Sequence, residues 1–301
     1  MSKPTILYIA GYSRSGSTIL DMLLGAHPEA VSTGELTFIL EDGRDPKRLC
    51  TCGEPYAKCQ FWGAWIAAHL PDEKTAASLR HMETRENLDK VLSGDVSTPE
   101  AESYKAYIDG LMSHIGQAAA PRVIVDSSKT ARDAAGRALA LSRIAGFDVR
   151  MLHLTRNPRS TVKSYIETGS NWAAEGYHKK KSFESWRPIF GWKYANAIAR
   201  QVGRELGDDR YMHVRYENLM NNPEAELARI GAFSGLDLTD IAKAVSSGEK
   251  FLAEHNVGGN RTRLEPQTIR LGEGTTPKLP FAHDLALRAF AGAEMRALGY
   301  S

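Results

Sequence analysis

The feature that most constrains this chain is a glycine-rich stretch, GYSRSGST at residues 11–18, which directly follows the apolar run TILYIA at residues 5–10. It agrees with the phosphate-binding loop pattern G-x-x-x-x-G-K-[ST] at three positions, Gly11, Gly16 and Thr18. A strand, such a loop and then a helix direct backbone N–H groups and the positive end of the helix dipole at one point. The stretch therefore predicts an anion-binding loop between a first strand and a first helix.

The loop lacks the lysine of the full pattern, because Ser17 stands in its place. In enzymes that use nucleoside triphosphates, this lysine neutralises the β- and γ-phosphates, and the Ser/Thr hydroxyl holds Mg²⁺. Arg14, three residues earlier, supplies a fixed charge with bidentate geometry instead. We expect a ligand with a compact anionic group at its 5′ end and no magnesium-bound triphosphate.

The length and composition fit a folded enzyme. At 301 residues, the chain is long enough for one large α/β domain or two small ones. The net charge of +2 gives no general attraction to nucleic acid, so an anion site must be a local cluster. The apolar run from Ile6 to Ala10 is too short for a signal-peptide core, and no other segment approaches membrane-spanning length. We expect a cytoplasmic protein without an integral membrane segment.

Short apolar runs alternate with helical patterns along most of the chain. The predicted strands are residues 5–10, 122–126, 149–155 and 210–216, and the predicted helices are residues 17–26, 131–144 and 185–206. This alternation predicts an α/β fold like that of P-loop NTPases, a parallel sheet flanked by helices. Residues 62–118 are helical and polar, and we interpret them as an insertion over the ligand crevice within one domain, residues 1–301.

Three cysteines cluster in LCTCGEPYAKCQFW, at Cys50, Cys52 and Cys59. An odd, clustered set argues against a disulfide framework. Zinc would need a fourth ligand, such as His69 or His81, and without one we expect no metal. A reduced structural turn and one local disulfide are the alternatives.

Several segments resemble those of sulfotransferases that use 3′-phosphoadenosine 5′-phosphosulfate. RSGST after a strand resembles the family's 5′-phosphosulfate loop, and VIVDSSK resembles its bacterial branch. LGAHPEAVSTGEL is similar to a segment of tyrosylprotein sulfotransferases and their bacterial relatives. Three later segments are also family-like: HLTRNPRSTVKSYI, VRYENL with the following NNPE, and HNVGGNRTRL. The matches lie in the family's order over most of the chain.

The resemblance implies a role for each matching residue. The donor's 5′ end is held by the loop residues Arg14, Ser15, Gly16, Ser17 and Thr18. The 3′-phosphate is held by Arg156 and Ser164, with Arg261 or Arg263 from the late loop. Tyr216 lies near the adenine, and the late loop with Gly259 and Asn260 closes over the nucleotide. Glu35 is the general base, and Lys129 is the cation at the leaving group.

Each of these residues also has an ordinary structural interpretation. Arg14 fits an exposed turn, Arg156 a salt bridge at a strand end, and Glu35 a solvated turn. Ser17 fits the N-cap of the first helix. Lys129 fits a surface position, although a helix N-terminus disfavours a cation and so suggests a nearby anion.

Other charged and aromatic residues receive weaker interpretations. Asp126 ends an apolar run, and we interpret it as a helix cap or a partner that orients Lys129. The basic run Lys179–Lys181 is either a solvated face or a gate at the nucleotide entrance. Large aromatics at helical spacing are usually core, but three tryptophans are candidates for an acceptor pocket: Trp172, Trp186 and Trp192.

The resemblance implies in-line transfer of a sulfuryl group to an acceptor hydroxyl without a metal, since positioning and fixed charges supply the stabilisation. We expect a small molecule, a lipid or a carbohydrate as the acceptor. Two alternatives remain on the sequence alone. One is a phosphoryl-transfer enzyme with a degenerate loop, and the other is an inactive nucleotide-binding scaffold.

Overall fold

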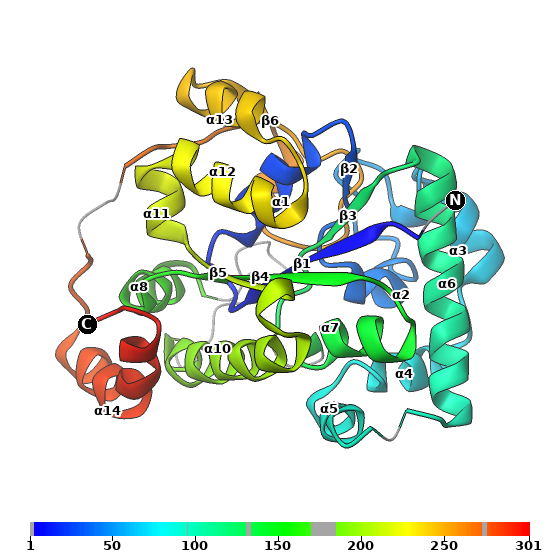
Figure 1. The fold of residues 1–301 in the computed structure, drawn as a ribbon, viewed down its shortest axis with the longest axis horizontal. Coiled ribbons are helices and arrows are strands. Elements are labelled where there is room, and N and C mark those ends of the chain that lie inside the picture. The colour runs from blue at the N-terminus through cyan, green and yellow to red at the C-terminus, as the bar shows by residue number, and fades with distance from the viewer. Residues whose placement is uncertain (1–2, 95, 131–133, 170–184, 273–275) are drawn as a thin grey trace.

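A computed structural model describes residues 3–94, 96–130, 134–169, 185–272 and 276–301. Its centre is a five-stranded, entirely parallel sheet with the strand order β2-β3-β1-β4-β5 (Figure 1). The strands are β1 (Thr5–Gly11), β2 (Ala30–Ser32), β3 (Val123–Asp126), β4 (Val149–Thr155) and β5 (Tyr211–Arg215). The α/β prediction and the four predicted strands are confirmed. The sequence analysis missed β2, whose three residues are too few to show a periodicity.

Alternate side chains of the strands enter two different cores, which explains why the strands read as continuous apolar runs. In β1, Ile6 and Tyr8 belong to one core, and Leu7 and Ile9 belong to the other. In β4, Met151 and Leu152 divide in the same way. The sheet is therefore buried on both faces, as the parallel topology requires.

Helices cover both faces of the sheet (Figure 1). On one face lie α1 (Ser17–Gly25), α11 (Tyr216–Asn221), α12 (Pro223–Ser234) and α13 (Thr239–Ser246). On the other lie α7 (Arg137–Leu139) with the π-helical turn η4 (Ala140–Ile144), and α10 (Arg187–Leu206). A third apolar cluster joins α10 to α8 (Pro158–Thr168) and α14 (Phe281–Ala297).

The segment 62–118 is helical, as predicted. It forms α3 (Gly63–His69), α4 (Glu73–His81), α5 (Arg85–Leu92) and α6 (Pro99–Ala119). Figure 1 shows α6 beside the start of β1, and Lys3 Nζ lies 2.8 Å from Asp109 Oδ1 of this helix. This contact is at the amino-terminal end of β1. The idea that the insertion borders an acceptor crevice remains a prediction.

Two helix predictions need correction. The expected helix at 131–144 is described from residue 134, and its regular part begins only at Arg137 and continues as a π-helical turn. Gly136 explains the late start, because its N–H donates to Glu83 O at 2.7 Å, outside any helix ladder. Ser17 is not the N-cap of α1, since Gly16 takes that position with a left-handed φ of 92°.

The remaining short elements lie between and after these helices. They are the 3₁₀ turns η1 (Leu36–Phe38), η2 (Tyr56–Lys58), η6 (Asp208–Arg210) and η7 (Arg261–Leu264), the helix α2 (Ile39–Asp42), and the antiparallel pair β6 (Lys250–Phe251) and β7 (Gln267–Thr268). β6 and β7 close the segment 252–266, which contains the predicted late loop.

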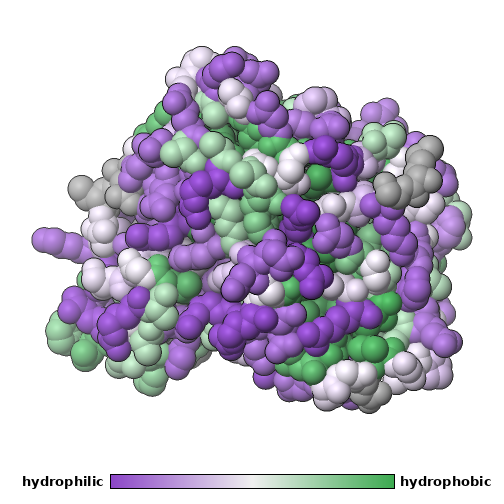
Figure 2. Space-filling view, in the orientation of Figure 1, coloured by the Kyte–Doolittle hydropathy of each residue, from purple (hydrophilic) through white to green (hydrophobic). Residues whose placement is uncertain are grey.

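The molecular surface is mostly hydrophilic on the face in Figure 2, with smaller hydrophobic areas between the polar residues. Three of the exposed large hydrophobic side chains belong to α14: Phe281, Leu285 and Phe290. Among the described residues, no helix combines the length and apolar character needed to cross a bilayer.

Candidate active site

One predicted site residue follows the carboxyl end of each strand. Arg14 follows β1, Glu35 follows β2, Lys129 follows β3, Arg156 follows β4, and Tyr216 follows β5. Because the strands are parallel, their carboxyl ends meet at one edge of the sheet. Central β1 has β3 on one side and β4 on the other, so the order in which the chain adds strands reverses at β1. The glycine loop follows β1 and therefore lies at this switch point. This is the position where open α/β sheets bind ligands.

The glycine loop is held in a conformation that few side chains would permit. A Cβ atom on Gly16 would lie 2.3 Å from the ring of Tyr216, so only glycine allows the loop to pack against this ring. Arg14 has a left-handed φ of 68°. A positive φ in a non-glycine residue is uncommon and concentrates at functional sites. Because Tyr216 follows β5, this packing holds the glycine loop against the carboxyl end of β5.

Arg14 contacts α8 and the residue that follows it. Its Nη1 donates to Ser164 Oγ at 3.3 Å, and its Nη2 donates to the carbonyl of Gly169 at 3.1 Å. Arg156 Nη1 in turn donates to the carbonyl of Arg14 at 3.3 Å. The structure thus brings together Arg14, Arg156 and Ser164, which the sequence analysis assigned to two different phosphates.

A cavity of about 650 Å³ lies against this cluster. Arg156, Ser164 and Tyr216 line it, and the Arg156 guanidinium lies 4.4 Å from the centre of the Tyr216 ring. Arg156 and Ser164 therefore face one space although eight residues separate them, because Arg156 precedes α8 and Ser164 lies on it. Lys163 and Arg270 also line the cavity. The sequence analysis missed both cations, and only the position of Lys163 beside Ser164 gave a signal.

Glu35 and Lys129 form an ion pair at the other side of the loop, between Lys129 Nζ and Glu35 Oε1. The two side chains are only 12% and 6% exposed. Lys129 has a left-handed φ of 69°, and its carbonyl accepts a hydrogen bond from the Tyr8 hydroxyl. Lys129 is thus not a surface residue, and its acidic partner is Glu35 rather than Asp126.

The late loop closes over this pair. A Cβ atom on Gly259 would lie 3.5 Å from Thr18 Oγ1 and 3.9 Å from Glu35 Oε1. The N–H of Asn260 donates to Thr18 Oγ1 at 3.2 Å. Arg263 is buried and donates to the carbonyl of Gly259 at 3.1 Å, whereas Arg261 is exposed. The cavity lining given above contains neither arginine.

Comparison with known proteins decides the family. A sequence model described as "Sulfotransferase family" matches residues 4–240, which is most of the chain. The chain belongs to the sulfotransferase family. No curated protein is significantly similar to it in sequence.

Solved sulfotransferases share the fold of this one. The sulfotransferase domain from the curacin biosynthetic pathway is 17% identical, with a TM-score of 0.56 over 99% of this chain and 98% of that one. Sulfotransferase STF9 from Mycobacterium avium is 16% identical, with a TM-score of 0.54 over 100% of this chain and 78% of that one. At these identities the likeness concerns the fold alone.

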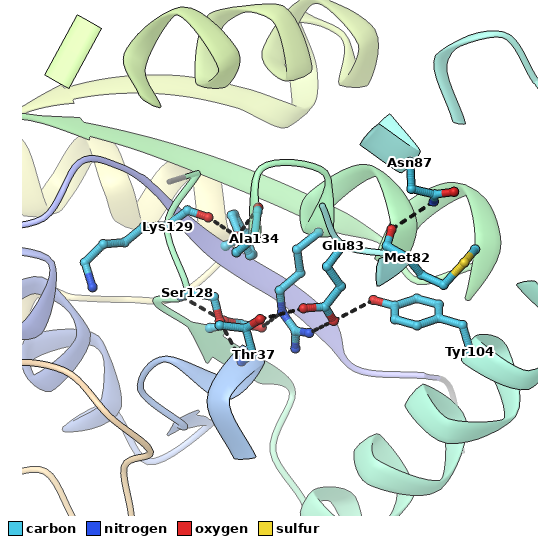
Figure 3. Close-up of polar contacts among 11 residues, drawn as sticks. Thr37, Met82, Glu83, Asn87, Tyr104, Ser128, Lys129 and Ala134 are labelled. Atoms are coloured by element: carbon cyan, nitrogen blue, oxygen red, sulfur yellow. Dashed lines mark hydrogen bonds and ion pairs between the residues drawn. The ribbon is translucent and has the colours of Figure 1, made fainter. Parts of the chain in front are cut away.

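A buried polar network lies next to the segments that carry Glu35 and Lys129 in this sulfotransferase (Figure 3). Arg137, which is fully buried, donates from Nε to Asp126 Oδ2 at 2.8 Å and from Nη1 to Glu83. Glu83 accepts from Thr37 Oγ1 at 2.6 Å, and the N–H of Thr37 donates to Ser128 Oγ at 3.0 Å. The last two residues are the near neighbours of Glu35 and Lys129.

The network corrects the interpretation of Asp126. This carboxylate is fully buried, and its partners are Arg137 and the N–H of Ser128, at 3.0 Å. It therefore does not orient Lys129 directly. Arg137 stands among alanine and leucine residues in the sequence, which was a signal of a buried cation. Nothing in the sequence indicated which residues it pairs with.

The pKa values in the network follow from burial and charge. Burial raises the pKa of Glu83, and the neighbouring Arg137 opposes this effect. Burial lowers the pKa of Arg137, but the charges of Asp126 and Glu83 raise it by more than burial lowers it. The pKa of Arg137 therefore lies well above its usual value. The arginine therefore stays charged and offsets the two buried carboxyl groups.

Among the remaining sequence candidates, Trp186 stacks on His283 with ring centroids 4.1 Å apart. His27 accepts the N–H of Glu29 at Nδ1, at 3.1 Å, which is a role in the turn after α1. Trp192 is buried in the third cluster, and its indole N–H donates to the carbonyl of Arg156 at 3.0 Å. Trp172 and Lys179–Lys181 lie outside the described residues.

Proposed function

We propose that this sulfotransferase transfers the sulfuryl group of 3′-phosphoadenosine 5′-phosphosulfate to an acceptor hydroxyl. The observation that carries the proposal is the Glu35–Lys129 pair, which Gly259 of the late loop approaches together with Thr18. Lys129, which follows β3, supplies a cation that the glycine loop lacks. Glu35 supplies a carboxylate, which is not needed to bind a phosphate. Sulfotransferases as a family generally use this donor.

The pair has a role for each partner in the reaction. The acceptor oxygen attacks sulfur as the bond from sulfur to the 5′-phosphate oxygen breaks, and the acceptor proton passes to Glu35. Lys129 and the N–H groups of the loop stabilise the charge that develops on the leaving phosphate oxygen. The products are a sulfate ester and the 3′,5′-bisphosphate nucleotide. Fixed positive charges carry this stabilisation without a metal ion.

The cavity beside Arg156 suits the other end of the donor. Arg156 and Ser164 offer a guanidinium and a hydroxyl to a 3′-phosphate, and Tyr216 offers an aromatic face to the adenine. We assign Arg14 to the 5′ end together with Ser15, Gly16, Ser17 and Thr18, although its guanidinium contacts Ser164 in this structure. We propose that Gly259, Asn260, Arg261 and Arg263 act as the closing loop.

Ligand-dependent stability tests the donor. A ligand that binds only the folded state stabilises it in proportion to the logarithm of its concentration over Kd. We expect 3′-phosphoadenosine 5′-phosphate to raise the melting temperature measured by scanning fluorimetry, and ATP with Mg²⁺ to leave it unchanged. A shift with ATP and Mg²⁺ alone would favour a phosphoryl-transfer enzyme and contradict the proposed donor.

Nucleotide binding should depend on Arg156 through the 3′-phosphate. Losing one partner of a desolvated charge pair typically costs about 2–4 kcal/mol, so we expect Arg156→Ala to weaken the 3′,5′-bisphosphate by roughly 30- to 1,000-fold in calorimetry. Adenosine 5′-phosphate, which lacks the 3′-phosphate, should lose little affinity. Arg159→Ala is the matched control, because Arg159 pairs with Asp284 at 2.8 Å. Equal losses for both nucleotides would remove Arg156 from the 3′-phosphate site.

The acceptor is a hydroxyl of a small molecule, a lipid or a carbohydrate. We propose that residues 62–118 and 165–195 position it within a single domain, residues 1–301. A screen of acceptor classes with the donor, read by a mass increase of one sulfuryl group, would identify the class. A cytoplasmic location stays a prediction, which fractionation of the source cells would test.

A further inference from the structure

The three cysteines form a cluster with a residue that lies far away in the sequence. The ligand atoms of Cys50, Cys52, Cys59 and His255 all lie within 4.8 Å of one another. We propose a structural zinc site formed by these four side chains. Three thiolates and one imidazole are a set that structural zinc sites use. The site is separate from the proposed transfer chemistry and does not depend on which donor or acceptor the enzyme uses.

Three distances within the cluster, those among Cys50, Cys59 and His255, are close to the edges of a zinc tetrahedron. With Zn–S bonds of about 2.3 Å and a Zn–N bond of about 2.05 Å, tetrahedral angles place two sulfurs about 3.8 Å apart, and a sulfur and a nitrogen about 3.6 Å apart. In the structure, Cys50 Sγ lies 3.6 Å from Cys59 Sγ. His255 Nδ1 lies 3.3 Å from Cys59 Sγ and 3.8 Å from Cys50 Sγ. Small adjustments would admit an ion at the centre.

A disulfide accounts for the cluster less well. A disulfide joins two sulfurs at about 2.05 Å, whereas Cys50 Sγ and Cys59 Sγ are 3.6 Å apart, and all three cysteines are free. A disulfide would also leave the third thiol and His255 without a reason to converge on the same point. A metal ion explains all four side chains together.

The surroundings are those of a metal–thiolate site. Cys50 and Cys59 are buried, and Cys52 is exposed. His255 Nε2 lies 3.3 Å from the side-chain amide of Gln60, whose oxygen can accept the ring N–H if the amide is turned. The ring of Phe61 stacks on His255 with centroids 5.4 Å apart.

The site would fasten the late loop to the cysteine segment. His255 lies within the segment closed by β6 and β7, five residues before Asn260. Its carbonyl accepts the indole N–H of Trp62 at 2.6 Å. Two residues later, the carbonyl of Val257 accepts the N–H of Glu35 at 2.6 Å. A zinc ion would therefore hold the backbone that positions both the closing loop and the proposed base.

The fourth ligand differs from those considered on the sequence alone. His69 Nδ1 lies 3.3 Å from the carbonyl of Trp65, and His81 Nδ1 lies 3.9 Å from Glu86 Oε2. Neither belongs to the cluster that contains the cysteines. With His255 in the fourth position, the sequence-based expectation of no metal is replaced by one structural ion outside the catalytic pair.

Metal analysis of the whole chain tests the site. The protein is purified without metal-affinity chromatography, and zinc is measured by mass spectrometry against protein concentration. We expect about one zinc per chain. Protein produced in a medium that contains cobalt in place of zinc should show the visible absorption of a tetrahedral cobalt–thiolate site. After denaturation with a chelator, three thiols per chain should react with a thiol reagent.

Variants assign the ligands. We expect Cys59→Ser and His255→Ala to lose most of the zinc, and His69→Ala, the matched control, to retain it. If the variants fail to fold, the zinc content, the cobalt spectrum and the thiol count of the wild-type protein still decide. A wild-type protein with less than about a tenth of a zinc per chain, or with one reactive thiol and a disulfide, overturns the proposal. So does equal zinc retention in all three variants.

Discussion

Glu35→Gln is expected to lower the turnover number by about 10²- to 10⁴-fold, the usual contribution of a general base. An alcohol is a weak nucleophile at neutral pH, and its proton must leave as the bond to sulfur forms. We propose Glu35 for this task because it pairs with Lys129 and does not line the cavity at Arg156. Glutamine keeps the shape and one acceptor oxygen but removes the basic carboxylate. Steady-state kinetics with saturating donor measure the effect.

Donor binding should survive this substitution. We expect the dissociation constant for 3′-phosphoadenosine 5′-phosphate to change less than about threefold, which is under about 1 kcal/mol. The melting temperature must be measured as well, because Lys129 is buried and loses its charged partner. His27→Ala is the competing variant, and its turn contact predicts near-normal turnover. Normal turnover in Glu35→Gln together with its loss in His27→Ala would transfer the role of base to His27.

Arg137→Met is expected to lower the free energy of unfolding by about 3–5 kcal/mol, because it leaves two buried carboxyl groups without their cation. Arg137 and Asp126 are fully buried, and the Glu83 side chain is only 3% exposed. Methionine fills a similar volume, so lost charge rather than lost packing should dominate. Urea denaturation followed by circular dichroism measures the change.

A surface ion pair provides the control for this variant. Arg143 lies in the π-helical turn that follows and pairs with Glu205 at 2.7 Å, with the two side chains 32% and 40% exposed. Arg143→Met should cost less than about 1 kcal/mol. Adding Glu83→Gln to Arg137→Met should restore part of the stability, because one uncompensated carboxyl group is removed. Equal costs for Arg137→Met and Arg143→Met would show that the buried network contributes no more than a surface pair.

Local signals predicted much of the fold. The apolar runs at β1, β3, β4 and β5 are long enough to identify as buried strands, and their alternation with helices gives the parallel sheet. β2 escaped because a three-residue strand carries no periodicity, and its existence depends on pairing with β3. The start of α7 at Arg137 also escaped, because the preceding Gly136 donates its N–H to Glu83 of the insertion.

The candidate site shows the same division. The sequence alone determined the glycine loop without its lysine and the residue types that follow the strands, because each depends on a few neighbouring positions. Only the tertiary structure decided which residues meet: Lys129 with Glu35, Arg14 with Ser164, and His255 with the three cysteines. These partners are separated by 94, 150 and about 200 positions. A local pattern carries no information on contacts that form only when the strands pair and the helices pack over them.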